Sequence, residues 1–107
     1  MALANRRIFD VANVNGSSGS HFRASPEDGS SWLAAWKKYK GVDAAEGIKC
    51  ANYRCPDKRP NATDGGHTRK IKDDDRSIYI VPLCHRCNCS NKPLRVDEYN
   101  LVPLAEL

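Results

Sequence analysis

The chain contains 107 residues, of which 40% are hydrophobic and 28% are charged, and its formal net charge is +4. Its mean hydropathy is −0.63, and no stretch approaches the ~18 consecutive apolar residues that a membrane-spanning helix needs. The composition therefore excludes a membrane span, and the length predicts a single small domain over residues 1–107.

The N-terminal segment, residues 1–29, predicts one strand followed by a loop. The chain begins with Met1 to Arg7, and no apolar stretch of the kind found in a signal peptide follows the two arginines of this range. We therefore expect no secretory signal and a cytoplasmic location. A short strand is expected over residues 8–14, ending at the turn pair Asn15-Gly16. The Gly- and Ser-rich residues 17–29 favour a loop.

Residues 30–41 predict an amphipathic helix. Ser30 or Ser31 caps its start, Gly41 ends it, and three lysines occupy the last turn, where cations oppose the helix dipole. Four apolar side chains recur at helical spacing on one face: Trp32, Leu33, Trp36 and Tyr39. We interpret the two tryptophans as core anchors; the alternative is that one of them is exposed to a partner.

The second half predicts a zinc-binding core over residues 50–92 and a C-terminal strand and tail over residues 93–107. The expected elements are strands at 67–71 and 77–81, a hairpin turn at 72–76, a short helix at 85–91, and a last strand from Leu94 that leads into a fraying acidic end. The predicted fold class is α+β: a knuckle, a β-hairpin and a short helix, with the tryptophan helix packed on them.

Four cysteines have the spacing of a tetrahedral metal site: Cys50-x4-Cys55 and, after 28 further residues, Cys84-x2-Cys87. A Cys-x2-Cys pair at the start of a helix brings two sulfurs close enough to share one metal, and a second pair from a turn completes four ligands. Zn²⁺ is favoured because it accepts thiolates and a tetrahedral geometry and has no redox chemistry. The sequence therefore predicts one structural zinc ion.

Two alternatives to a four-sulfur site remain open. His67 follows Gly65-Gly66, where the backbone can approach closely, so three cysteines with His67 form the alternative ligand set. Otherwise the cysteines are buried hydrophobic or redox thiols without a metal. The count of five cysteines argues against a disulfide framework. Cys89 is expected to be a free thiol, and His85 is expected to lie outside the ligand set.

The segment from Cys50 to Lys92 resembles a treble-clef zinc finger, and more closely the zinc-stabilised HNH group. The resemblance rests on Cys50 and Cys55, on Gly-Gly-His67, and on a strand followed by Val-Pro-Leu-Cys84-His-Arg-Cys87-Asn88. It covers less than half of the chain. A looser likeness, which adds Val14-Asn-Gly and Ser31-Trp-Leu, extends to small uncharacterised bacterial proteins of this layout.

The resemblance implies three catalytic positions, as in HNH nucleases. There a first histidine acts as general base on water, an asparagine orients the strand, and a later histidine helps to hold a catalytic divalent metal. His67 matches the first position, but Tyr79 stands at the second, and Asn88 or Lys92 at the third. A nuclease needs both an activated water and charge stabilisation on the phosphate. We therefore expect a scaffold that retains the structural zinc without the chemistry.

Three functions are compatible with these residues. The first is a non-catalytic zinc module that binds nucleic acid or a protein partner. Its candidate basic residues are Arg69, Lys70, Lys72, Arg86, Lys92 and Arg95. Residues 50–95 hold ten Lys and Arg against five Asp and Glu, a net charge of +5, although the run Asp73–Asp75 interrupts the basic face. The second is a divergent HNH-type metal-dependent nuclease that uses His67 and this acidic run. The third is a partner-binding protein in which zinc only stabilises a surface.

Overall fold

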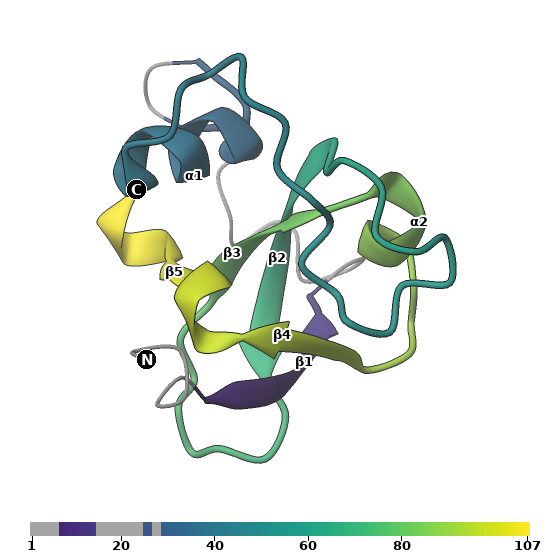
Figure 1. The fold of residues 1–107 in the computed structure, drawn as a ribbon. Helices are drawn as coiled ribbons and strands as arrows, with labels where there is room; N and C mark the ends of the chain where they lie inside the picture. The colour runs from purple at the N-terminus through teal and green to yellow at the C-terminus, as the bar shows by residue number, and fades with distance from the viewer. Residues whose placement is uncertain (1–6, 15–24, 27–28) are drawn as a thin grey trace.

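A computed structural model describes residues 7–14, 25–26 and 29–107 of the chain (Figure 1). Its main elements, in chain order, are β1 (Ile8–Asn13), α1 (Trp32–Lys40), β2 (Asp64–Lys70), β3 (Tyr79–Leu83), α2 (His85–Asn88), β4 (Leu94–Asp97) and β5 (Val102–Pro103). The loop predicted over residues 17–29 falls mostly outside the described residues. No helix in the described part of the chain is long and apolar enough to cross a membrane.

The five strands form one antiparallel sheet in the order β4-β1-β2-β3-β5, which confirms the α+β class. Both edge strands come from the same C-terminal segment, and only residues 98–101 separate them. The two edges of a flat five-stranded sheet would lie about 19 Å apart. Because residues 98–100 form a compact 3-10 turn, so short a connection requires the sheet to curl, as Figure 1 shows.

The curled sheet carries an apolar cluster on each face. The larger cluster includes Val11, Val81, Leu94 and three of the cysteines. In the smaller cluster, both tryptophans of α1 pack against Ile80 and Val102. Consecutive residues of β3 therefore alternate between the two clusters, as the pleat of a strand requires. The strand β3 therefore contacts both clusters: Ile80 packs against the tryptophans of α1, and Val81 packs in the cluster that contains the cysteines.

The helix α1 begins and ends close to the predicted residues. The Ser31 hydroxyl accepts a hydrogen bond from the first turn, and Gly41 ends the helix in the left-handed conformation with a φ of 72°. Trp32 and Trp36 are 7% and 1% exposed, which confirms them as core anchors and leaves no exposed tryptophan for a partner. Tyr39 is 49% exposed, so its predicted place on the buried face is wrong.

Gly65 sets how closely α1 approaches the sheet. A Cβ atom at this position would lie 2.6 Å from both the Leu33 nitrogen and the Trp32 carbonyl carbon, which are backbone atoms. The first turn of α1 can therefore rest on β2 only because residue 65 has no side chain. The sequence predicts a close approach to the backbone at Gly65-Gly66. At Gly65 the group that approaches is the first turn of α1, and at Gly66 the side chains of Leu83 and Asn88 take the space that a Cβ atom would occupy.

Several boundaries differ from the sequence prediction: β2 covers Asp64–Lys70 instead of 67–71, and α2 covers His85–Asn88 instead of 85–91. β3 covers residues 79–83 instead of 77–81 and includes Pro82. A proline is tolerated there because β5 pairs only with Tyr79 and Ile80, so no strand on that side needs a hydrogen bond from the nitrogen of residue 82. The acidic end does not fray: residues 104–106 form a 3-10 turn, and Leu104 and Leu107 pack against the tryptophan cluster.

Candidate metal centre

The first pair of cysteines lies on a loop, the knuckle of residues 50–60, that is tied to the sheet. The Cys50 backbone nitrogen donates to the Pro60 carbonyl at 2.7 Å, which closes the base of the loop. The Ala51 nitrogen donates to Pro82 of β3 at 2.8 Å, and the Tyr53 nitrogen donates to the Arg95 carbonyl of β4 at 2.8 Å. These bonds fix the knuckle between two strands that are not adjacent in the sheet.

The knuckle returns through two residues in a left-handed conformation. Lys58 and Arg59 have φ values of 62° and 58°, and each such residue costs about 1–2 kcal/mol for an L side chain. The conformation brings Arg59 back onto the knuckle, where its Nε donates to the Cys50 carbonyl at 2.8 Å. The same guanidinium lies 4.6 Å from the centroid of the Tyr53 ring. These contacts offset the backbone strain.

The second pair of cysteines belongs to α2. Cys84 is the N-cap residue, with an extended backbone, and Cys87 lies in the single turn that follows. Asn13 of β1 fixes the far end of this helix, because its Nδ2 donates to the carbonyls of Cys87 and Ser90 at 2.8 Å each. The last carbonyls of a helix lack partners within it, so Asn13 both satisfies them and attaches α2 to the sheet.

The four sulfurs of Cys50, Cys55, Cys84 and Cys87, here called the cysteine centre, all lie within 4.8 Å of one another. The Sγ atoms of Cys55 and Cys84 are 3.8 Å apart, and all five cysteines are free thiols. Two sulfurs on a tetrahedral zinc ion, each about 2.3 Å from the metal, would be about 3.8 Å apart. The cysteine centre therefore fits a zinc ion and is much too open for a disulfide.

Backbone N–H groups point at the sulfurs of the knuckle. Those of Asn52 and Cys84 donate to Cys50, and those of Asp57 and Arg59 donate to Cys55. Burial raises the pKa of Cys55, but these donors outweigh burial and lower it overall. Burial dominates at Cys50 and Cys87, whose thiol pKa values are raised. A divalent cation deprotonates the thiols that coordinate it, so the centre needs a metal to become four thiolates.

Asn52 is a buried polar residue that the sequence interpretation missed. Its side chain makes hydrogen bonds to three segments around the cysteine centre. Nδ2 donates to the Cys87 sulfur at 3.3 Å, and Oδ1 accepts from the backbone nitrogens of Arg54 and Arg95 at 3.0 Å each. The residue is 3% exposed. It therefore joins a ligand of one pair to the knuckle of the other. Its position two residues after Cys50 was the only available signal.

His67 lies on β2, opposite Ile80 of β3. Its imidazole packs edge to face against Trp32, with ring centroids 5.3 Å apart, and burial lowers its pKa. Among the described residues, the cysteine centre is the one group of three or more His, Cys, Asp and Glu side chains whose ligand atoms converge. The alternative ligand His67 does not belong to it.

Cys89 and His85 lie beside the cysteine centre on the same short helix and are exposed. The Cys89 sulfur is 3.4 Å from His85 Nε2, and His85 Nδ1 is 2.9 Å from Asp64 Oδ2. Asn88 Nδ2 also donates to Asp64 Oδ2, at 2.9 Å. This chain of side chains attaches α2 to the start of β2, so Asp64 and Asn88 have a positioning role.

Four of the six candidate basic residues line two separate depressions. Arg86 and Lys92 line a cavity of about 660 Å³ beside the cysteine centre, and so does Arg54, which the sequence interpretation did not single out. Lys70 and Lys72 line a smaller one of about 220 Å³, together with two carboxylates, those of Asp10 and Asp73. Arg69 is exposed on β2, and Arg95 on β4 lies 4.0 Å from Asp10.

The acidic run Asp73–Asp75 organises the turn between β2 and β3. Asp73 accepts a hydrogen bond from the Asp75 nitrogen at 3.2 Å, and Asp75 accepts from the Ser77 nitrogen at 2.8 Å. Asp75 also accepts from the Tyr79 hydroxyl, and this bond holds the pKa of the Asp75 carboxyl well below its usual range. Two of the three carboxylates are thus used within the hairpin.

Comparison with family models, with curated proteins and with solved structures finds no match for this chain.

Proposed function

We propose that this chain is a non-catalytic zinc-binding module. In this proposal one structural Zn²⁺ at the cysteine centre holds together a treble-clef core, and the core binds a macromolecular partner, nucleic acid or protein. The observation that carries the proposal is the convergence of four sulfurs within 4.8 Å. Four thiolates complete the coordination of zinc and leave no position for a substrate or a reacting water, which is the arrangement of structural sites.

The order of the elements supports the treble-clef description. The knuckle with Cys50 and Cys55 comes first, the β2–β3 hairpin follows, and α2 presents the second pair of ligands at its start. The residues that fix these parts, Asn13 and Asn52, bond to α2 from the sheet and from the knuckle. Five free cysteines are also typical of a protein in a reducing compartment, in line with the expected cytoplasmic location.

The structural role of zinc follows from how little else holds the knuckle. Of residues 50–60, only Cys50, Ala51 and Asn52 are buried. Ordering the backbone costs about 1–2 kcal/mol per residue, and no apolar side chain of residues 53–60 is buried to offset it. Zinc binding in small modules contributes on the order of 10 kcal/mol. Removal of the metal should therefore unfold residues 50–92 at least.

The test measures zinc content and folding together. Protein purified in reducing buffer should contain one zinc ion per chain, and a strong chelator should collapse the dispersed amide signals of residues 50–92 in the NMR spectrum. Cys84→Ser and Cys87→Ser should act like the chelator. Cys89→Ser, on the same helix but outside the cysteine centre, is the matched control and should keep its zinc and its dispersion. A zinc content near zero, or full dispersion after zinc removal, would contradict the proposal.

The surroundings of His67 support the non-catalytic part of the proposal. A nuclease of the HNH type would need its histidine beside a bound divalent ion. The imidazole contacts Trp32, and the described residues bring no carboxylate or second histidine to it as a metal-binding group. A plasmid-nicking assay with Mg²⁺ or Mn²⁺ should therefore show no cleavage. Nicking that His67→Ala abolishes would establish the nuclease instead.

A further inference from the structure

The cavity beside the cysteine centre is a concave feature that the zinc site leaves without a role. Its volume of about 660 Å³ lies within the range of ligand sites, 300–1,000 Å³. The knuckle forms one wall, the end of α2 another, and the start of β4 closes it. The two walls carry one cysteine pair each, so the same zinc ion that holds the knuckle against α2 would also hold the cavity open.

The lining combines three cations with an apolar surface. Arg54, Arg86 and Lys92 supply the charge, and the described residues contribute no carboxylate to the lining. Pro56 and Pro93, both exposed, supply the apolar surface, and Asn52 and Ser90 also line the cavity. Arg54 and Lys92 are exposed, whereas Arg86 pairs with Asp57 at 3.4 Å. Arg54 and Lys92 are therefore the cations with the most freedom to meet a ligand.

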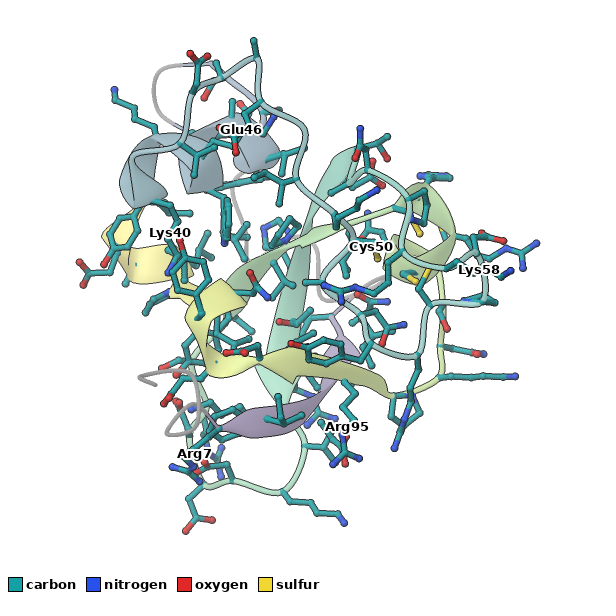
Figure 2. The ribbon with its side chains drawn as sticks, in the orientation of Figure 1. Arg7, Lys40, Glu46, Cys50, Lys58 and Arg95 are labelled. Atoms are coloured by element: carbon teal, nitrogen blue, oxygen red, sulfur yellow. The ribbon has the colours of Figure 1, made fainter. Side chains whose placement is uncertain are left out.

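Positive charge is concentrated in this part of the chain. The two segments that build the cavity, residues 50–63 and 84–96, hold six Lys and Arg and a single Asp, a net charge of +5. Four thiolates on one Zn²⁺ would contribute −2, which leaves +3. The smaller depression at β1 and β2 combines its cations with Asp10 and Asp73 instead. Figure 2 places Lys58 at the tip of the knuckle and Cys50 at its base, with the cluster of sulfurs between the knuckle and α2.

These features together specify the chemistry of a ligand. Arginine matches the geometry of a phosphate, and lysine provides a point charge. A ligand of phosphate alone would leave the apolar wall and most of the volume unused, whereas a phosphate joined to a sugar and a base would use both. In a duplex the base is stacked and paired and could not enter, so an unpaired nucleotide fits best.

We propose that this cavity binds a nucleotide unit of single-stranded nucleic acid, with the phosphate on Arg54 and Lys92 and the base against Pro56 and Pro93. The inference deepens the proposed function and depends on it, because zinc fixes both walls. A nucleotide phosphate also occurs in free nucleotides, and an acidic peptide would be attracted to the same cations. The experiment separates these sources.

The test compares two double variants that remove the same charge. Arg54→Ala/Lys92→Ala empties the cavity of its accessible cations. Arg69→Ala/Lys72→Ala removes two exposed cations elsewhere and is the matched control. Binding of a fluorescein-labelled oligothymidylate is followed by fluorescence anisotropy across a series of salt concentrations, with one zinc per chain verified for each protein. Competitors are a thymidine mononucleotide, a duplex of the same length and an oligoglutamate peptide.

The unmodified chain should bind the single strand with a salt-dependent affinity. The cavity variant should bind at least tenfold more weakly, and its slope of log K against log salt should fall by about 0.7, since both cations contact the same phosphate and each phosphate contact on a single strand contributes about 0.7. The control variant should keep most of the affinity, and none of the three competitors should match the single strand at equal nucleotide or charge concentration.

Equal losses in the two variants would overturn the inference, because they would indicate diffuse charge. Competition by the mononucleotide, the duplex or the peptide at such concentrations would overturn it as well, and would assign the cavity to that ligand. A zinc-loaded chain that binds no strand refutes the inference and leaves the zinc module intact. A chain without zinc refutes the proposed function itself.

Discussion

Replacing Asn52 with alanine tests whether the buried amide holds the cysteine centre together. The substitution removes three hydrogen bonds: one to the Cys87 sulfur and two from the backbone nitrogens of Arg54 and Arg95. A neutral hydrogen bond contributes about 0.5–1.5 kcal/mol and one to a charged group about 1.5–3 kcal/mol, which gives about 2.5–6 kcal/mol in total. Asn52 lines the cavity, so water can reach the vacated groups. We therefore expect the lower half of this range, about 2.5–4 kcal/mol.

The measurement is urea unfolding of the zinc-loaded protein, followed by the fluorescence of the buried tryptophans. Zinc affinity is measured in parallel by competition with a chelator. Loss of an outer hydrogen bond to a ligand typically weakens metal affinity by 10- to 100-fold, and we expect Asn52→Ala to fall in that range. Asn91→Ala, at an exposed position of the same region, is the matched control.

Asn52→Asp separates the two halves of the effect. A carboxylate keeps an oxygen for the two backbone donors but places negative charge beside the Cys87 sulfur. We expect it to weaken zinc binding at least as much as alanine does while it destabilises the protein less at saturating zinc. If Asn52→Ala leaves both the free energy of unfolding and the zinc affinity within error of the unmodified protein, the assigned role of the amide is wrong.

Three further predictions follow from other parts of the fold. A maleimide should modify one thiol, Cys89, in the zinc-loaded chain and all five after chelation; rapid reaction of a second thiol with zinc bound would contradict the cysteine centre. Gly65→Ala should lower the free energy of unfolding by about 1–3 kcal/mol, because its Cβ would meet backbone atoms of α1 at 2.6 Å; an unchanged thermal midpoint would show that α1 moves without cost. Burial lowers the pKa of His67 in the fold. Below pH ~6.5 the unfolded chain therefore binds a proton that the folded chain does not, and the free energy of unfolding decreases as the pH is lowered. His67→Gln should reduce this dependence at saturating zinc, and identical pH profiles for the two proteins would refute it.

The elements that the sequence predicted correctly depend on local chemistry. The Ser cap, the apolar spacing and Gly41 define α1 within a dozen consecutive residues, and the Cys-x2-Cys pair brings two of the converging sulfurs together at the start of α2. Local patterns of this kind survive in the fold because they need no information about distant residues. The same reasoning predicted the β2–β3 hairpin, apart from shifts of two or three residues at its ends.

The features that the sequence did not reveal depend on contacts between distant residues. Asn52 is an ordinary polar residue until β4 supplies Arg95 as its partner, 43 positions away. Nothing in the sequence around Asn13 indicates that it caps α2, because its hydrogen-bond partners are the carbonyls of Cys87 and Ser90, more than 70 positions away. The two edge strands β4 and β5 read as one strand in the sequence, and only the curl of the sheet explains why the chain divides at residues 98–101.

The basic residues illustrate the same limit for the functional surface. The sequence suggests one basic face because the candidate basic residues all lie within residues 50–95, namely Arg69, Lys70, Lys72, Arg86, Lys92 and Arg95. In the fold, Lys70 pairs with Asp75 at 3.5 Å and lies 4.2 Å from the centroid of the Phe9 ring, on a different part of the sheet. Arg54 instead joins Arg86 and Lys92 at the cavity.

X-ray absorption at the zinc edge of the purified chain identifies both the metal and its ligands in one measurement. We expect one zinc ion per chain with four sulfur neighbours at about 2.3 Å and no nitrogen or oxygen bound to the metal. A first shell of three sulfurs and one nitrogen would contradict the four-sulfur site and point to a histidine ligand. Absence of zinc from the purified chain would contradict the zinc module altogether.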